Sequence, residues 1–207
     1  MRIIDISMPI HLGMPVYNNR EEKKPKFTIT RNFENDSGVR ETKIELDLHT
    51  GTHMDAPLHM IKEGQDSSFF RAEDMIAPCR VLDLTNVEDG IIKEDLVKHG
   101  IKQGDFVILK TRNSFAEDFE PDFVYVKESG AKYLVSIGVT GVGIDSLGIE
   151  RSQPDHVTHR LLLGNGIHIL EGLRLKDVEE GNYTLVAVPL SIRDVEASPV
   201  RALLLKE

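Results

Sequence analysis

The segment DLHTGTHMDAPLH, residues 47–59, is the part of the chain from which the fold and the function are best inferred. It holds three of the eight histidines and an aspartate, and these four residues have the same parity: His49, His53, Asp55 and His59. In an extended chain, side chains of one parity point to one face, whereas a helix spreads these four over about 160°. Gly51 and Pro57 also disfavour a helix. The pattern therefore predicts a strand that runs into an ordered loop and directs these side chains into one pocket.

Imidazoles and a carboxylate on one face are a good ligand set for zinc or manganese. The alternative is a polar loop without a ligand. Three histidines and a carboxylate of one parity are, however, costly to bury unless something pairs with them. Three ligands from one short segment complete only part of a metal site, so we expect the remaining ligands elsewhere in the chain.

Length and composition predict one domain that spans residues 1–207, with hydrophobic and charged contents of 40% and 29% that are typical of a globular protein. The net charge of -9, with no basic run that contains interleaved aromatic residues, argues against a nucleic-acid partner. Cys79 is the only cysteine, which excludes an intrachain disulfide and a thiolate zinc cluster.

The N-terminal sequence MRIID is interrupted at once by charges and does not resemble a signal peptide. No apolar run approaches the roughly 20 residues that span a bilayer. We therefore expect a cytoplasmic protein that acts on a small-molecule substrate and has no membrane partner.

Strand patterns dominate both ends of the chain, and strands alternate with helices in the middle. Residues 106–109 are continuously apolar and predict a buried strand. Ser37-Gly38 predicts a turn. The other expected strands are 3–6, 27–33, 42–48, 81–84, 139–144, 167–170, 184–189 and 200–205, and the expected helices are 94–99, 126–137 and 156–163. This order favours an α/β domain with a mixed sheet.

Residues 49–59 match the signature of the cyclase family of metal-dependent hydrolases, which includes bacterial kynurenine formamidase and isatin hydrolase. Five later segments resemble family blocks in the family's order: FRAEDM (70–75), VGIDS (142–146), HRLLL (159–163), ILEGL (169–173) and SPVRA (198–202). The resemblance covers essentially the whole chain. It implies an α/β domain with a mixed, partly barrel-like β-sheet flanked by helices, of the swivelling β/β/α kind, assembled as a homodimer or homotetramer.

The resemblance also implies the ligands of a metal ion: His49, His53, Asp55, His159 and Glu171. Such a set holds one zinc ion, or two at a separation of about 3.5–4 Å with Asp55 and Glu171 as bridges. Within the family, the site of isatin hydrolase resembles a manganese site, so manganese is the alternative metal. His59 is implied as the catalytic residue, because an imidazole accepts a proton from metal-bound water and passes it to the leaving amine.

Several assignments stay open in the sequence. His156 lies one helical turn from His159, and spacing alone does not choose between them. His59 has a structural alternative, and Asp145 is equally well explained as an imidazole-orienting partner or as a turn residue. Tyr17 stands in a Met-Pro-Val-aromatic segment of the family and is expected to contact the substrate, although kynurenine formamidases tend to carry tryptophan there.

The expected function is that of a metal-dependent amidohydrolase. Its substrate would be a small amide such as N-formylkynurenine, an N-formyl aryl amine, cleaved by metal-bound hydroxide with His59 as proton shuttle. Ring opening of a lactam or lactone uses the same chemistry and is the alternative. A non-catalytic, metal-stabilised binding protein is a third hypothesis, and the additional imidazole of His59 argues against it.

Overall fold

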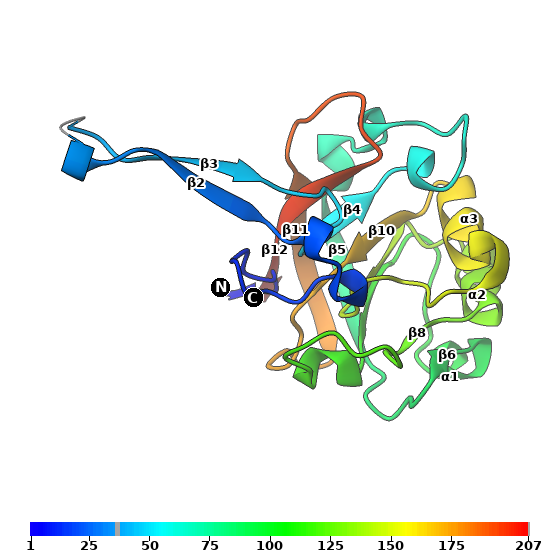
Figure 1. The fold of residues 1–207 in the computed structure, drawn as a ribbon. Coiled ribbons are helices and arrows are strands. Elements are labelled where there is room, and N and C mark those ends of the chain that lie inside the picture. The colour runs from blue at the N-terminus through cyan, green and yellow to red at the C-terminus, as the bar shows by residue number, and fades with distance from the viewer. Residues whose placement is uncertain (36–37, 207) are drawn as a thin grey trace.

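A mixed sheet of eight strands lies at the centre of the protein (Figure 1). The computed structural model describes residues 1–35 and 38–206, so Ser37 of the predicted turn lies outside the described residues. In order across the sheet, the strands are β1 (Arg2–Asp5), β12 (Ala197–Lys206), β11 (Gly181–Pro189), β5 (Ile76–Asp83), β7 (Phe106–Lys110), β9 (Gly141–Ile144), β10 (His168–Glu171) and β4 (His53–Asp55).

The sheet closes on itself because β4 pairs with two strands. It is antiparallel to β10 on one side and to the beginning of β12 on the other. Strands β5, β7, β9 and β10 are parallel neighbours, while β11 and β12 are antiparallel to the strands beside them. The predicted α/β fold with a mixed, barrel-like sheet is therefore confirmed, and the single-domain assignment stays a prediction.

Side chains fill the barrel completely, as they do in barrels with few strands. Phe106 and Ile108 of β7 pack inside with residues of β10, β11 and β12, whereas Val107 and Leu109 pack on the outer face. A Cβ atom on Gly141 of β9 would lie 2.1 Å from the Phe106 ring. The glycine in this strand therefore makes room for the aromatic ring.

Three helices cover the outer face of the parallel strands: α1 (Lys93–Val97), α2 (Glu128–Ile137) and α3 (Val157–Gly164) (Figure 1). Leu134 of α2 and Leu162 of α3 are fully buried in the same cluster as Leu109 and Ile144 of the sheet. Two small sheets pair β2 (Lys26–Arg31) with β3 (Glu41–Glu45) and β6 (Gly90–Ile91) with β8 (Tyr125–Val126). Within the described ranges, no helix has the length and apolar character needed to cross a membrane.

The structure corrects the predicted strand through the histidine segment. The strand predicted at 42–48 ends at Glu45, and a turn follows in which the Thr50 N–H donates to the Asp47 carbonyl. Only His53–Asp55 is a strand, while His59 ends a 3-10 turn. Gly51 adopts a positive φ of 77°, which an extended strand does not contain. The common parity of the four side chains therefore does not explain how they meet.

Gly141→Ala is expected to lower the free energy of unfolding by about 1–3 kcal/mol, because the added methyl group overpacks the barrel against Phe106. Gly13→Ala is the matched control, since its Cβ would meet no atom closer than 3.7 Å, and we expect a change below about 0.5 kcal/mol. Urea denaturation of both variants measures the difference. Equal stabilities would show that the barrel interior has room to spare.

Candidate metal centre

The strand that closes the barrel also carries the centre of the predicted site. Met54 of β4 points into the barrel core, so its neighbours His53 and Asp55 point to the opposite face, where they are buried. His53 lies directly opposite Glu171 of β10 in the antiparallel register. Closure of the barrel therefore brings together two segments that are far apart in the sequence.

The five predicted metal ligands converge around two carboxylates. His53 Nε2 lies 3.5 Å from Asp55 Oδ1 and 3.4 Å from Glu171 Oε2. His159 Nε2 lies 3.6 Å from Asp55 Oδ2 and 3.4 Å from Glu171 Oε1. The fifth residue, His49, places Nδ1 at 3.0 Å from Asp55 Oδ1. The geometry thus assembles the set that the sequence suggested, while its role as a ligand set stays a prediction.

These residues fit a divalent cation. Several buried atoms of the cluster have no hydrogen-bond partner among the described residues: His49 Nε2, His53 Nε2, Asp55 Oδ1 and Asp55 Oδ2. Buried polar atoms are normally paired, because leaving one without a partner costs free energy. Ligand atoms of His53, Asp55 and Glu171 lie within 4.8 Å of one another. A cation bound by nitrogen and oxygen would satisfy these atoms.

The charges of the cluster lead to the same conclusion. Burial disfavours the charged form of His53, but its contacts with Glu171 and Asp55 raise the pKa of the imidazole to about 9. Burial likewise opposes the charge of His159, and Glu150, Glu171 and Asp55 raise its pKa to about 10. The two central carboxylates therefore require positive charge beside them, which protons or a divalent cation supply.

Glu150 orients His159 and was not identified from the sequence. Its Oε2 accepts hydrogen bonds from the backbone N–H of His159 at 3.0 Å and from Nδ1 at 2.6 Å. The Thr158 N–H donates to Oε1, so one carboxylate holds both the start of α3 and the imidazole. Asp155 is a second acid before the same helix, and no sequence signal distinguishes the two.

The structure distinguishes His159 from His156. His156 is exposed, lies in a turn with a φ of 49°, and has its ring 6.4 Å from that of His159. His159 is buried and faces Asp55 and Glu171. The position of the helix therefore favours His159 as the ligand.

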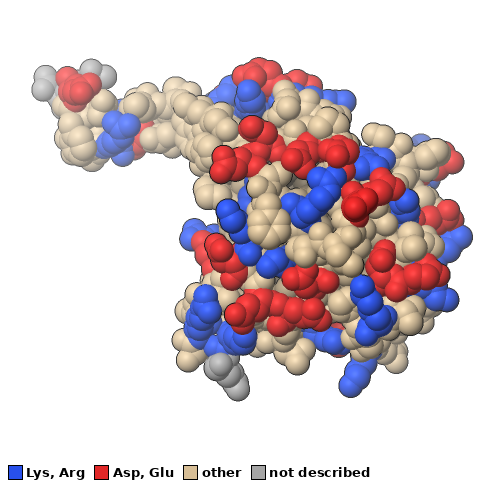
Figure 2. Space-filling view, turned by 90° about the horizontal axis from the view of Figure 1, so that it is seen from below, with Lys and Arg blue, Asp and Glu red and all other residues tan. Residues whose placement is uncertain are grey.

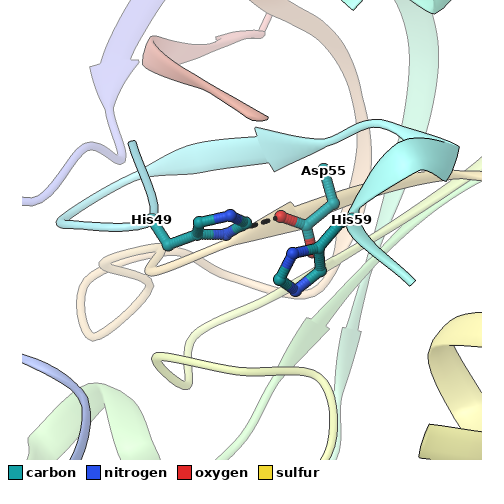
Figure 3. A group of neighbouring side chains, drawn as sticks. All are labelled: His49, Asp55 and His59. Atoms are coloured by element: carbon teal, nitrogen blue, oxygen red, sulfur yellow. Dashed lines mark ion pairs between the residues drawn. The ribbon is translucent and has the colours of Figure 1, made fainter. Parts of the chain in front are cut away.

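His59 lies beside the cluster and faces the same space as His49 and Asp55 (Figure 3). Its ring centroid lies 4.1 Å from that of His49 and 5.6 Å from that of His159. Burial lowers the pKa of His59 to about 4; Asp55 and Glu171 act to raise this pKa, and the imidazoles of His49 and His159 act to lower it. The imidazole is therefore neutral at neutral pH and able to accept a proton.

A pocket of about 400 Å³ leads from the surface to this cluster. His49, His59, His159 and Glu171 of the site line this pocket, and Tyr17 lines it as well. The Tyr17 ring is supported by Phe119 at a centroid distance of 5.5 Å. The expected substrate-contacting tyrosine therefore lies at the pocket, on a turn rather than on the sheet.

Asp145 lies outside the metal cluster. It is buried at the end of β9 and accepts hydrogen bonds from Thr111 and Ser114, with Thr111 donating through both its backbone N–H and its hydroxyl group. None of these contacts involves an imidazole. Of the two interpretations, the structure supports a carboxylate that holds a turn together.

Comparisons with known proteins agree with this geometry. The Cyclase family model matches residues 4–151. Kynurenine formamidase of Salinibacter ruber is 34% identical over 99% of this chain and 97% of its own. A solved structure described as a potential metal-dependent hydrolase with cyclase activity has a TM-score of 0.92 at 46% identity, and covers 98% of this chain and 96% of its own. Isatin hydrolase A of Labrenzia aggregata shares the fold, with a TM-score of 0.85 at 24% identity over 100% of this chain and 94% of its own. The chain therefore belongs to the cyclase family.

Proposed function

We propose that this protein is a metal-dependent amidohydrolase that cleaves an N-formyl aryl amine such as N-formylkynurenine. The observation that carries the proposal is a cluster of imidazoles and carboxylates that lines a pocket and holds buried nitrogen and oxygen atoms without a hydrogen-bond partner among the described residues. Similarity to kynurenine formamidases along nearly the whole chain supports the choice of a formamide.

His49, His53, Asp55, His159 and Glu171 would hold the cation. We propose zinc, as one ion or two, with manganese as the alternative, because nitrogen and carboxylate ligands suit both metals. Such an ion, when bound, acidifies a water molecule and polarises the scissile carbonyl. The chain holds four of these side chains on β4, β10 and α3, and it holds His49 on the turn that precedes β4.

We propose His59 as the group that moves the proton. Hydrolysis joins the water oxygen to the formyl carbon, breaks the carbon–nitrogen bond and releases formate and the amine. The attacking water loses a proton and the departing nitrogen gains one. A neutral imidazole beside His49 accepts the first proton and donates it to the nitrogen.

Tyr17 would bind the aryl group. Tyr17 lines the same pocket as the histidines, and its ring packs against Phe119 and Phe123. A planar substrate can stack on a tyrosine ring held in this way. Ring opening of a lactam such as isatin needs the same attack and the same proton transfer, so it is the competing activity. We also propose that the reaction takes place in the cytoplasm.

The purified protein loaded with zinc or manganese is expected to hydrolyse N-formylkynurenine with a higher kcat/KM than isatin. The pocket and the proton-transfer group suit both substrates, so the comparison measures how the wall around Tyr17 discriminates between them. Product formation followed by chromatography gives both rate constants. Faster turnover of isatin would reassign the protein to lactam opening, and hydrolysis of neither substrate by the metal-loaded protein would contradict the proposal.

Glu150→Gln is expected to weaken metal binding by about 10–100-fold, because the amide no longer holds His159 by a charged hydrogen bond. Asp155→Asn is the matched control, an exposed acid before the same helix, and should bind metal normally.

His159→Ala should lose the metal, whereas His156→Ala should keep it. Titration with zinc and elemental analysis after dialysis measure these effects; loss of metal in His156→Ala alone would reverse the assignment.

His59→Ala is expected to lower kcat by about 10²–10⁴-fold without loss of metal, since general acid–base catalysis contributes rate enhancements of that size. His11→Ala, an exposed histidine away from the pocket lining, serves as the control and should keep full activity. Steady-state kinetics and metal content are measured on the same preparations. Full activity in His59→Ala would remove its role in proton transfer.

A further inference from the structure

Acidic and basic side chains both line the pocket of about 400 Å³ beside the candidate metal centre. The acids are Glu150 and Glu171, and both are buried. Glu150 accepts hydrogen bonds from His159, while Glu171 accepts one from the Ile149 N–H and faces His159 Nε2. Because both carboxylates are engaged within the candidate metal centre, neither is free to pair with a cation on another part of the pocket wall.

Two long basic side chains line the same pocket, those of Arg20 and Lys23. Lys23 Nζ lies 3.3 Å from Asp47 Oδ1, so its charge is already paired. Arg20 is exposed, and its side chain has no carboxylate partner among the described residues. A guanidinium group keeps its charge at physiological pH and offers several N–H donors in one plane. Arg20 therefore brings a positive charge and unused donors to the pocket wall.

The backbone ties the segment of Arg20 to the candidate metal centre. Arg20 directly follows the turn Tyr17–Asn19, in which both asparagines have a positive φ, of 56° and 51°. Asparagine adopts this left-handed conformation more readily than most residues. The Lys23 N–H donates to the Arg20 carbonyl, and the Thr50 hydroxyl donates to the Lys23 carbonyl. Thr50 is the neighbour of His49, so these bonds hold the cation and a proposed metal ligand in a common framework.

The net charge of the protein makes a cation at this position informative. The whole chain carries a charge of -9, and acidic and basic side chains are interspersed over the face shown in Figure 2. The protein as a whole therefore does not attract anions, and salt screens charges that lie far from a bound molecule. An anion in the pocket would gain its attraction from direct contact with a nearby cation, and Arg20 offers that contact.

We propose that Arg20 binds a carboxylate of the substrate while the scissile amide lies at the candidate metal centre. The assignment rests on the proposed function, which places the amide beside His59. The planar guanidinium can donate two parallel hydrogen bonds to the two oxygens of a carboxylate, and its single charge balances that of the carboxylate. Tyr17 lines the same pocket and would contact the aryl ring. The pocket therefore selects an anionic formyl aryl amine over a neutral one.

Two formamides that differ in the carboxylate test this selection. N-formylkynurenine carries the carboxylate, whereas 2′-formamidoacetophenone has the same formyl aryl ketone without it. In the zinc-loaded protein, Arg20→Gln should raise KM for N-formylkynurenine about 10-fold, because a charge-assisted hydrogen bond is lost. The change in kcat should be small, since the contact is the same in the ground state and the transition state. KM for 2′-formamidoacetophenone should rise by less than about 2-fold.

Two further variants control for charge and for shape. Arg2→Gln removes the same charge from an exposed arginine on β1 that does not line the pocket, and it should leave both KM values unchanged. Arg20→Lys keeps the charge but loses the planar donors, so its KM for N-formylkynurenine should lie between those of the unmodified protein and Arg20→Gln. An equal rise for both formamides in Arg20→Gln, or no rise for either, would overturn the proposal.

Binding of the amine products separates this proposal from the proposed function. Calorimetric titration of the zinc-loaded protein should show tighter binding of kynurenine than of 2-aminoacetophenone, and Arg20→Gln should remove most of that difference. If this preference is present but neither formamide is hydrolysed, the proposed function fails and the carboxylate site stands. If both formamides are hydrolysed but product binding does not depend on Arg20, the carboxylate site fails and the proposed function stands. Equal binding of the two amines by the unmodified protein would also exclude the site.

Discussion

The burial of two neighbouring carboxylates is the constraint on which the rest of the structure depends. Asp55 and Glu171 lie on adjacent strands, and both side chains are almost inaccessible to water. Two negative carboxylates so close together repel each other in a medium of low dielectric constant, and their burial adds a desolvation cost. Three imidazoles surround them, and a divalent cation would complete the neutralisation. Because β4 is the strand that closes the barrel, closure of the sheet also brings Asp55 and Glu171 together.

Side chains alternate between the two faces of the short strand β4, so this strand contributes both to the barrel core and to the site. Met54 contributes to the barrel core, while the residues on either side of it contribute to the site. Groups that must hold a fixed geometry lie on rigid elements: His53 and Asp55 on β4, Glu171 on β10 and His159 on α3. His59, which would exchange protons with substrate and water, ends a short turn beside the pocket.

The sequence predicted the residues of the site better than the way in which they meet. The histidine segment and its family blocks named all five proposed ligands, and the apolar run of β7 predicted a buried strand correctly. Parity failed as an explanation because Gly51 and the turns around it place His49 and His59 outside any strand. Glu150 could not be predicted, since a carboxylate that orients an imidazole has no fixed spacing from it. The projection of the hairpin of β2 and β3 was equally hidden, because alternation looks the same whether or not the rest of the chain covers the apolar face.

The order of segments along the chain connects the pocket with the hairpin of β2 and β3. Tyr17, which lines the pocket, comes before the hairpin, and the histidine segment comes directly after it. The two ends of the hairpin are linked at its base, since Lys23 Nζ lies 3.3 Å from Asp47 Oδ1 and the Thr50 hydroxyl donates to the Lys23 carbonyl. These two contacts tie together the segments that flank the hairpin. One segment carries Tyr17 and the other carries His49, and both residues line the pocket, so the contacts at the base of the hairpin help to fix the space into which a substrate must fit.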